Sequence, residues 1–146
     1  MDPRVSFITL AVPDLEAERA FYVDGLGWEP AMWVPDDVLM IKVGDKLLLS
    51  LWVEAAFEAE VGAIVRGPGL APITLAHNLP ERDQVDGVIE DARAAGATSV
   101  QEAQEREWGG YTGYFADPAG YRWEVAWNPG PIGQTVLPGA SEGDPA

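Results

Sequence analysis

The sequence predicts an α+β fold made of two related βαβββ halves. Three observations support this prediction: a strand-like segment occurs twice, each copy precedes a helix that ends at glycine, and each half closes with a hairpin. Strands and helices interleaved in this way within a short chain are typical of α+β domains. With 146 residues and 47% hydrophobic side chains, the chain can bury a core of its own. We therefore expect a single domain over residues 1–128.

Each half opens with a strand of related sequence. The segment Ile8–Val12 recurs as Ile73–His77, with Ile, Thr, Leu and Ala in the same order. Both segments are rich in residues that favour strands. Aligning the two copies places Phe7 of the first half at the position of Pro72 in the second.

A helix follows each strand. Asp14 is a suitable N-cap for a helix over Leu15–Leu26, and Asp83 precedes apolar residues at i, i+3, i+4 and i+7. Gly27 and Gly96 stand where these helices should end, because glycine readily adopts the left-handed conformation of a C-terminal cap.

Each half continues with extended segments and a hairpin. In the first half, Gly44-Asp45 forms the expected two-residue turn between strands over 38–43 and 46–53. In the second half, Asp117-Pro118-Ala119-Gly120 suits a three-residue hairpin, with proline at the second turn position and glycine closing it. Such a hairpin would place Glu124 opposite Tyr114.

The remaining segments connect or extend the halves, which we assign to residues 4–53 and 71–128. The linker over 54–70 is acidic and alanine-rich before Gly67-Pro68-Gly69, which predicts a short helix or coil. The tail over 129–146 is rich in proline and glycine without periodicity, so we expect it to be disordered or to lie over a neighbouring surface.

Composition and charge exclude several classes of function. The chain has no cysteine, which excludes disulfides, thiolate zinc sites and cysteine nucleophiles. The formal net charge of −15 disfavours nucleic acids and anionic membranes as partners. No stretch approaches the roughly 18 apolar residues of a membrane span, and the first residues lack the pattern of a signal peptide. We expect a cytoplasmic protein whose charge serves solubility or attracts cationic small molecules.

Three motifs relate the chain to a known family. They are Val12-Pro13-Asp14-Leu15 followed by Phe21-Tyr22, then Leu26-Gly27-Trp28, and the Phe-x-Asp-Pro-x-Gly run over 115–125 that contains Glu124. With the internal repeat, they resemble the vicinal oxygen chelate superfamily, which includes glyoxalase I, extradiol dioxygenases, fosfomycin-resistance enzymes and bleomycin-resistance proteins. The resemblance covers about residues 4–128. It implies an incomplete barrel around a cleft and assembly as a homodimer, but one scaffold carries unrelated chemistries.

The resemblance also implies where a metal would be bound. Metal-dependent members take histidine or glutamate ligands from the first and last strand of each half. The matching positions here are Phe7, Ser50, Pro72 and Glu124, of which only Glu124 is a ligand residue. A phenyl ring and a proline have no lone pair to donate, so we expect no metal and no cofactor. His77, the only histidine, should face away from these positions and be structural or superficial.

The candidate ligand-binding residues are the family positions, their neighbours and a set of aromatic residues. Glu124 could act as a general base or accept a hydrogen bond from a ligand, or it could simply bond to a neighbouring strand. Trp123 and Trp127 are assigned to the core. Glycines near several aromatic residues would leave a ligand room to stack on a ring. The full set is Phe7, Thr9, Trp33, Ser50, Trp52, Thr74, Trp108, Tyr111, Tyr114 and Glu124.

Two functions fit this site. We favour a metal-free protein that binds an aromatic or cationic metabolite or antibiotic without transforming it. The alternative is an enzyme of the same fold, such as a lyase, isomerase or dioxygenase-like protein, with Glu124 as base or metal ligand. A subunit or sensor with a vestigial cleft is a third possibility, which no residue specifically supports.

Overall fold

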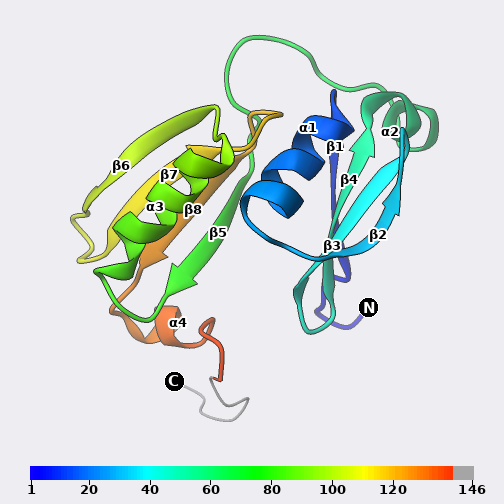
Figure 1. Cartoon of the computed structure of the whole chain (residues 1–146). Helices are drawn as coiled ribbons and strands as arrows, with labels where there is room; N and C mark the ends of the chain where they lie inside the picture. Colours follow the sequence, from blue (N-terminus) through cyan, green and yellow to red (C-terminus); the bar gives the residue numbers. More distant parts are fainter. Residues whose placement is uncertain (140–146) are drawn as a thin grey trace. The chain divides into compact units, whose positions relative to one another are not determined.

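The computed structural model describes residues 1–139, which form two compact units divided between Gly69 and Leu70. Each unit contains one four-stranded mixed sheet with helices (Figure 1), so the fold is α+β as predicted. The first unit follows the order β1, α1, η1, β2, β3, β4, α2 along the chain, and the second follows β5, α3, β6, β7, β8, α4. The predicted incomplete barrel depends on the placement of the two units and stays a prediction.

The sheet of the first unit has the strand order β1-β4-β3-β2. Strand β1 pairs in parallel with β4, whereas the other neighbours are antiparallel. The side chains on one face are apolar and form the core of the unit, with Leu39, Leu49 and Leu51 at most 1% exposed. The strands span β1 Phe7–Val12, β2 Pro30–Val34, β3 Val38–Gly44 and β4 Leu47–Val53.

The helix of the first unit begins as an α-helix and ends as a π-helix. Asp14 is its N-cap, because the Ala17 amide donates a 3.0 Å hydrogen bond to Asp14 Oδ1. The α-helical part, α1, covers Leu15–Arg19, and the π-helical part, η1, covers Ala20–Gly25. In η1 the Leu26 amide donates to the Phe21 carbonyl at 2.9 Å, one residue further back than in an α-helix. The sequence predicted a helix over this whole span but not its change of pitch.

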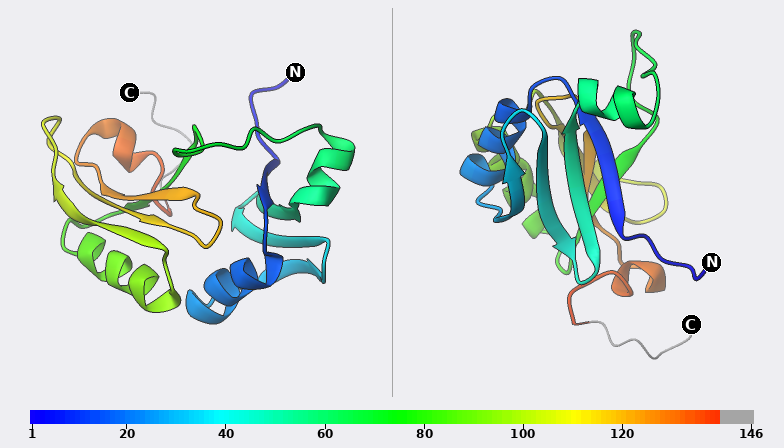
Figure 2. Two further views of the ribbon diagram at one scale, coloured as in Figure 1. Left: turned by 90° about the horizontal axis from the view of Figure 1, so that it is seen from above. Right: turned by 90° about the vertical axis from the view of Figure 1, so that its right-hand side faces the viewer.

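The sheet of the second unit repeats this plan with the order β5-β8-β7-β6. Helix α3 packs on one face, and α4 lies toward the other side of the sheet (Figure 2). Gly96 ends α3 in the left-handed conformation with φ of 104°, as the sequence predicted. The elements span β5 Thr74–Leu79, α3 Gln84–Ala95, β6 Ser99–Glu105, β7 Tyr111–Ala116, β8 Arg122–Trp127 and α4 Pro131–Gln134.

The two hairpins differ in how well local sequence predicted them. The predicted pairing of Tyr114 with Glu124 is confirmed, and Gly120 takes a φ of 92° at the closing position. The first hairpin turns one residue later than predicted: Gly44 pairs with Leu47, so Asp45-Lys46 is the connection. A register shift between Lys42 and Gly44 accounts for the displacement, because a bulge adds one residue to its strand.

Strand pairing corrects the alignment of the two halves. Phe7 starts β1 opposite Leu48, and Thr74 starts β5 opposite Arg122. Thr74 is therefore the counterpart of Phe7, and Pro72 is not, because Pro72 precedes β5. Ser50 lies two residues after Leu48, the partner of Phe7. Glu124 likewise lies two residues after Arg122, the partner of Thr74, so Ser50 is the counterpart of Glu124. The repeated letters of the two strands are thus displaced by two residues from their structural match.

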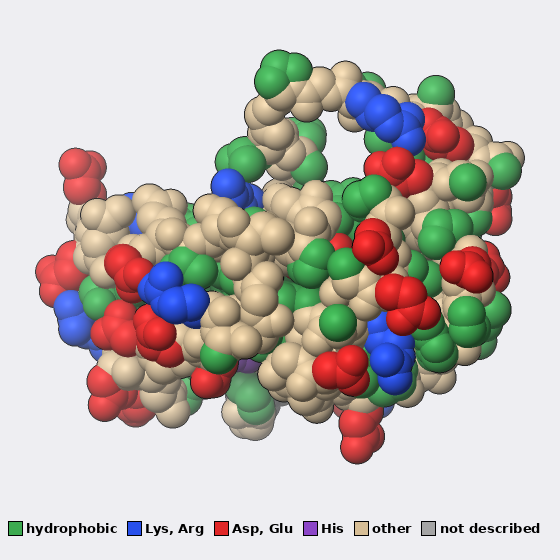
Figure 3. All heavy atoms as spheres, turned by 45° about the horizontal axis from the view of Figure 1, so that its top comes forward, with side chains coloured by type: hydrophobic (Ala, Val, Ile, Leu, Met, Phe, Trp, Pro, Cys, Tyr) green, Lys and Arg blue, Asp and Glu red, His purple; other side chains and the backbone are tan. Residues whose placement is uncertain are grey.

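The connecting segments are partly ordered. The linker contains α2, Glu54–Glu60, where the ring of Phe57 contacts that of Trp52 with centroids 6.3 Å apart. Helix α4 lies within the predicted tail, whose last residues, 140–146, fall outside the described part of the chain. None of the helices in residues 1–139 is both long and apolar enough to span a membrane. Acidic side chains are spread over the face shown in Figure 3 rather than gathered in one patch.

Candidate functional site

The second sheet has two chemically different faces. A Cβ atom at Gly113 would lie 3.0 Å from Ile89 Cδ1 of α3, and Phe115 stacks on Trp123 on the same face. Because side chains alternate along a strand, Tyr114 and its partner Glu124 lie on the opposite face. We call the face turned away from the packed helix the distal face, here and in the first unit.

Tyr114 and Glu124 are bonded on the distal face. The Tyr114 hydroxyl donates a short hydrogen bond to Glu124 Oε2, and both side chains are half-buried. The hydrogen bond to the carboxylate, followed by loss of surrounding water, raises the pKa of Tyr114 above 10.0. This pair offers a ligand one carboxylate and one phenol in a fixed arrangement.

Arg106 lies beside this pair and was missed in the sequence. It follows β6 and folds back onto β7, where Nε donates to Thr112 Oγ1 at 2.5 Å and Nη2 donates to the Thr112 carbonyl at 3.3 Å. Its guanidinium carbon is 5.7 Å from the centroid of the Tyr114 ring. Within residues 1–139, no carboxylate forms an ion pair with Arg106.

Trp108 is held in place by a glycine in the β6–β7 turn. Its ring lies so close to Gly110 that a Cβ atom there would be 1.8 Å from Trp108 Cη2. The turn is closed by hydrogen bonds from the Arg106 amide to the Gly110 carbonyl, 2.8 Å, and from the Gly109 amide to the Arg106 carbonyl, 2.9 Å. Trp108 nevertheless remains 56% exposed, so part of the indole is available to a ligand.

The distal face of the first sheet holds the other predicted residues. Thr9 pairs with Ser50, and Phe7 lies two residues from Thr9 on the same face. Phe7 is 51% exposed, whereas Ser50 is 1% exposed and its Oγ has no hydrogen-bond partner among residues 1–139. Trp52 lies on this face too, where it contacts α2.

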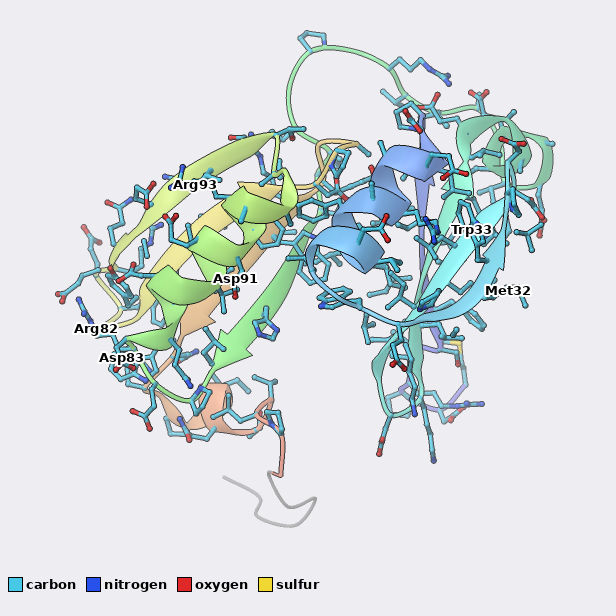
Figure 4. The ribbon with its side chains drawn as sticks, in the orientation of Figure 1. Met32, Trp33, Arg82, Asp83, Asp91 and Arg93 are labelled. Carbon is cyan, nitrogen blue, oxygen red and sulfur yellow. The ribbon has the colours of Figure 1, made fainter. Side chains whose placement is uncertain are left out.

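Two predicted site residues lie on the helix-covered faces instead. Trp33 pairs with Leu39 of the core, and the guanidinium of Arg19 lies 5.5 Å from its ring centroid (Figure 4). Tyr111 donates a hydrogen bond of 2.9 Å to Asp86 of α3, and Arg82 lies 3.9 Å from its ring centroid. One residue of register decides which face a side chain occupies, and local sequence predicts no register for the strand of Trp33. The predicted pairing of Tyr114 with Glu124 already places Tyr111, three residues before Tyr114, on the opposite face. The other eight predicted residues lie on or beside the distal faces, four in each unit: Phe7, Thr9, Ser50 and Trp52 in the first, and Thr74, Trp108, Tyr114 and Glu124 in the second.

The four family positions do not form a suitable donor set for a divalent metal. With Pro72 replaced by its true counterpart, these positions are Phe7, Ser50, Thr74 and Glu124. They offer one carboxylate, two hydroxyls and a phenyl ring, whereas divalent metals need several carboxylate, imidazole or thiolate ligands. In the part of the chain that is described, no group of three or more His, Cys, Asp or Glu side chains could hold a metal ion.

His77 lies apart from these positions. It pairs with Val125, whose side chain is buried on the face covered by α3. The imidazole is exposed at the edge of the sheet, yet nearby atoms displace enough water to lower the pKa of His77 below 6.5. Its position agrees with the prediction that it faces away from Glu124.

Comparison with known proteins identifies the wider group. Residues 4–125 match the model of the Glyoxalase/Bleomycin resistance protein/Dioxygenase superfamily. A glyoxalase-related enzyme from Fulvimarina pelagi is 34% identical, with 86% of this chain and 88% of that chain aligned and a TM-score of 0.77. A lactoylglutathione lyase from Agrobacterium tumefaciens is 23% identical, with coverage of 88% and 96% and a TM-score of 0.67. No curated protein matches the chain.

Proposed function

Because this chain belongs to the Glyoxalase/Bleomycin resistance protein/Dioxygenase superfamily, we propose that it binds a planar small molecule without using a metal centre. The observation that carries this proposal is the set Phe7, Ser50, Thr74 and Glu124 at the family's metal-binding positions. Its one carboxylate already accepts a hydrogen bond from Tyr114. Such a set suits recognition by hydrogen bonds and ring contacts better than chelation.

Aromatic side chains would supply much of the binding energy. Trp108 and Phe7 are more than half exposed on or beside the distal faces. A ligand that covered these rings would remove their apolar surface from water. An aromatic pair contributes about 0.5–1.5 kcal/mol beyond the area it buries, so a few rings can give useful affinity. The ligand is an aromatic metabolite or an antibiotic, recognised through these rings. On this proposal the protein sequesters its ligand.

The test combines a binding screen with metal analysis. Purified protein is analysed for divalent ions and then titrated with planar aromatic compounds by calorimetry, with and without EDTA. We expect less than one-tenth of an equivalent of metal, binding that EDTA does not change, and recovery of the compound unaltered. A stoichiometric divalent ion whose removal abolishes binding would contradict the proposal.

The Tyr114–Glu124 hydrogen bond favours one alternative, an enzyme in which Glu124 is a general base. A carboxylate within hydrogen-bond reach of a substrate could remove a proton, and the phenol would hold it in position. In that case a bound compound would be converted, and Glu124→Gln would abolish conversion while retaining binding. Mass spectrometry of the recovered compound separates the two functions.

Assembly and location are further proposals. The apolar residues Ile132 and Val136 of the tail are 72% and 59% exposed, which would suit contact with a second copy of the chain. We propose a homodimer in the cytoplasm, to be tested by light scattering and by fractionation of cells that express the protein.

A further inference from the structure

Arg106, Trp108 and Tyr114 form a continuous row on the distal face of β7. Positions 112 and 114 share this face, because every second residue of a strand points the same way, and Gly110 directly precedes the strand. The ring of Trp108 lies against Gly110, and Arg106 donates a hydrogen bond to Thr112. Tyr114 follows Thr112 on the same face, with its ring beside the guanidinium of Arg106. The row therefore presents an indole, a guanidinium and a phenol in order, which we call the β7 row.

Arg106 is the charged member of the β7 row and is held rigidly. Two of its nitrogen atoms, Nε and Nη2, are bonded to Thr112, which is fully buried. A guanidinium has five N–H donors, so the Nη1 group still has both donors for another acceptor. Such an anchored fork suits carboxylate and phosphate oxygens.

Arg106 shares the absence of an ion pair among residues 1–139 with Lys42, Lys46 and Arg122. Glu105 pairs with Arg82, and Arg93 pairs with Glu90 and Glu102, so nearby carboxylates are used elsewhere. Arg106 keeps its charge without such a pair in the described residues, although Glu107 follows it directly. Arg106 is half-buried, and its guanidinium carbon lies 5.7 Å from the centroid of the Tyr114 ring, so it is placed to accept an anionic group beside that ring.

We infer that the β7 row recognises a planar molecule that carries an anionic oxygen group, with Trp108 as the stacking surface and Arg106 as the residue that selects the charge. This inference rests on the proposed binding function and narrows its ligand class. Most of the acidic surface does not oppose it, because charges more than about 8 Å away are largely screened at physiological ionic strength. The nearer carboxylate of Glu124 accepts a hydrogen bond from the Tyr114 hydroxyl.

Three probes with one ring system test this inference: 2-naphthoate, 2-naphthamide and 2-naphthylmethylammonium, titrated into the full chain by calorimetry. We expect naphthoate to bind about tenfold more tightly than naphthamide and to shift the indole N–H signal of Trp108 in NMR spectra. Arg106→Gln should remove the preference for naphthoate and leave naphthamide affinity within about twofold. Arg106→Lys, which keeps the charge but loses the fork, should retain only part of the preference.

Two further variants separate stacking from charge recognition. Gly110→Ala must displace the indole of Trp108, so it should weaken all three probes by a similar factor while the preference for naphthoate persists. Arg93→Gln removes an equal charge from an ion pair near the end of α3 and is the matched control that should change neither affinity nor preference (Figure 4). Thermal melts confirm that each variant is folded.

The outcomes distinguish the inference from the proposed function. Equal affinity for the three probes, unaltered by Arg106→Gln, would overturn the role of Arg106 and leave planar-molecule binding intact. Tighter binding of the ammonium probe than of naphthoate would overturn it as well. If none of the probes binds at millimolar concentration, both the β7 row and the proposed binding function are wrong.

Discussion

Tyr114 and Glu124 face each other directly across the antiparallel pair β7–β8, and the tyrosine hydroxyl donates its hydrogen bond to Glu124 Oε2. This pairing fixes the carboxylate at one of the positions predicted for a metal ligand to a phenol of the same sheet. The bond engages Oε2, and the second oxygen of a carboxylate can accept from another partner.

Glu124→Gln should lower the pKa of Tyr114 toward 10.0. The carboxylate accepts a hydrogen bond from the phenol and so stabilises its protonated form, whereas a neutral amide does so less. The titration can be followed by NMR of tyrosine labelled at Cζ. Tyr111 is the internal control, because its pKa is raised by a hydrogen bond to Asp86 and should not change. An unaltered pKa at Tyr114 would contradict the hydrogen bond.

Ser50→Ala should leave the free energy of unfolding unchanged or raise it by about 1 kcal/mol. The hydroxyl is buried without a hydrogen-bond partner in the described residues, and an unsatisfied buried polar group costs about 1–3 kcal/mol. Thr112→Val is the contrasting variant, because its hydroxyl accepts a hydrogen bond from Arg106 and its loss should destabilise by about 1–2 kcal/mol. Urea denaturation measures both. Destabilisation by Ser50→Ala equal to that of Thr112→Val would show that Ser50 has a partner.

His77 should titrate below 6.5 in an NMR pH titration, since desolvation lowers its pKa in the folded chain. At pH values between the folded and the unfolded pKa of His77, the unfolded chain therefore binds more protons than the folded chain. The contribution of His77 to the free energy of unfolding is therefore complete above about pH 6.5, the unfolded pKa. It decreases as the pH falls toward the folded pKa. The difference between wild type and His77→Gln isolates it from the many carboxylates. A His77 pKa at or above 6.5 would contradict the desolvated position.

Gly87→Ala should raise the free energy of unfolding by about 0.5–1 kcal/mol. Gly87 lies inside α3 with nothing near its missing Cβ, and alanine loses less backbone entropy on folding. Gly96→Ala is the opposite case, because φ is 104° there and a Cβ atom is strained in the left-handed region. Denaturation curves should move in opposite directions for the two variants. Equal destabilisation would mean that Gly87 is more closely packed than the structure shows.

Local signals made much of the fold predictable. Asp14 caps the first helix, Gly96 ends α3, and the turn ending at Gly120 sets the pairing of Tyr114 with Glu124. Each of these depends on the chemistry of a few adjacent residues. The fold class therefore followed from the sequence alone.

Pairing over longer distances was harder to predict. Chance identity of four letters aligned Phe7 with Pro72, whereas hydrogen bonding to β4 and β8 aligns it with Thr74. Trp33 and Tyr111 were placed in the site because they are aromatic, but register puts both on helix-covered faces. A linear pattern carries no direct information on which strand a residue will oppose.

Arg106 was missed for a related reason. It lies in a turn and gains its position only by folding back onto Thr112. A basic residue two positions before the Trp108-Gly109-Gly110 run in a strongly acidic chain is the signal that could have indicated it.

The wide turn of η1 determines what the deletion of one residue from this helix would do. Phe21 and Tyr22 are consecutive yet at most 1% exposed, and the Leu26 amide reaches back five residues to Phe21. Deleting one residue from this turn would restore ordinary α-helical spacing while rotating the following side chains by about 100°. The backbone bonds would survive such a deletion, but the side chains before and after it would no longer both face the core, so shortening this segment would expose apolar side chains that are now buried.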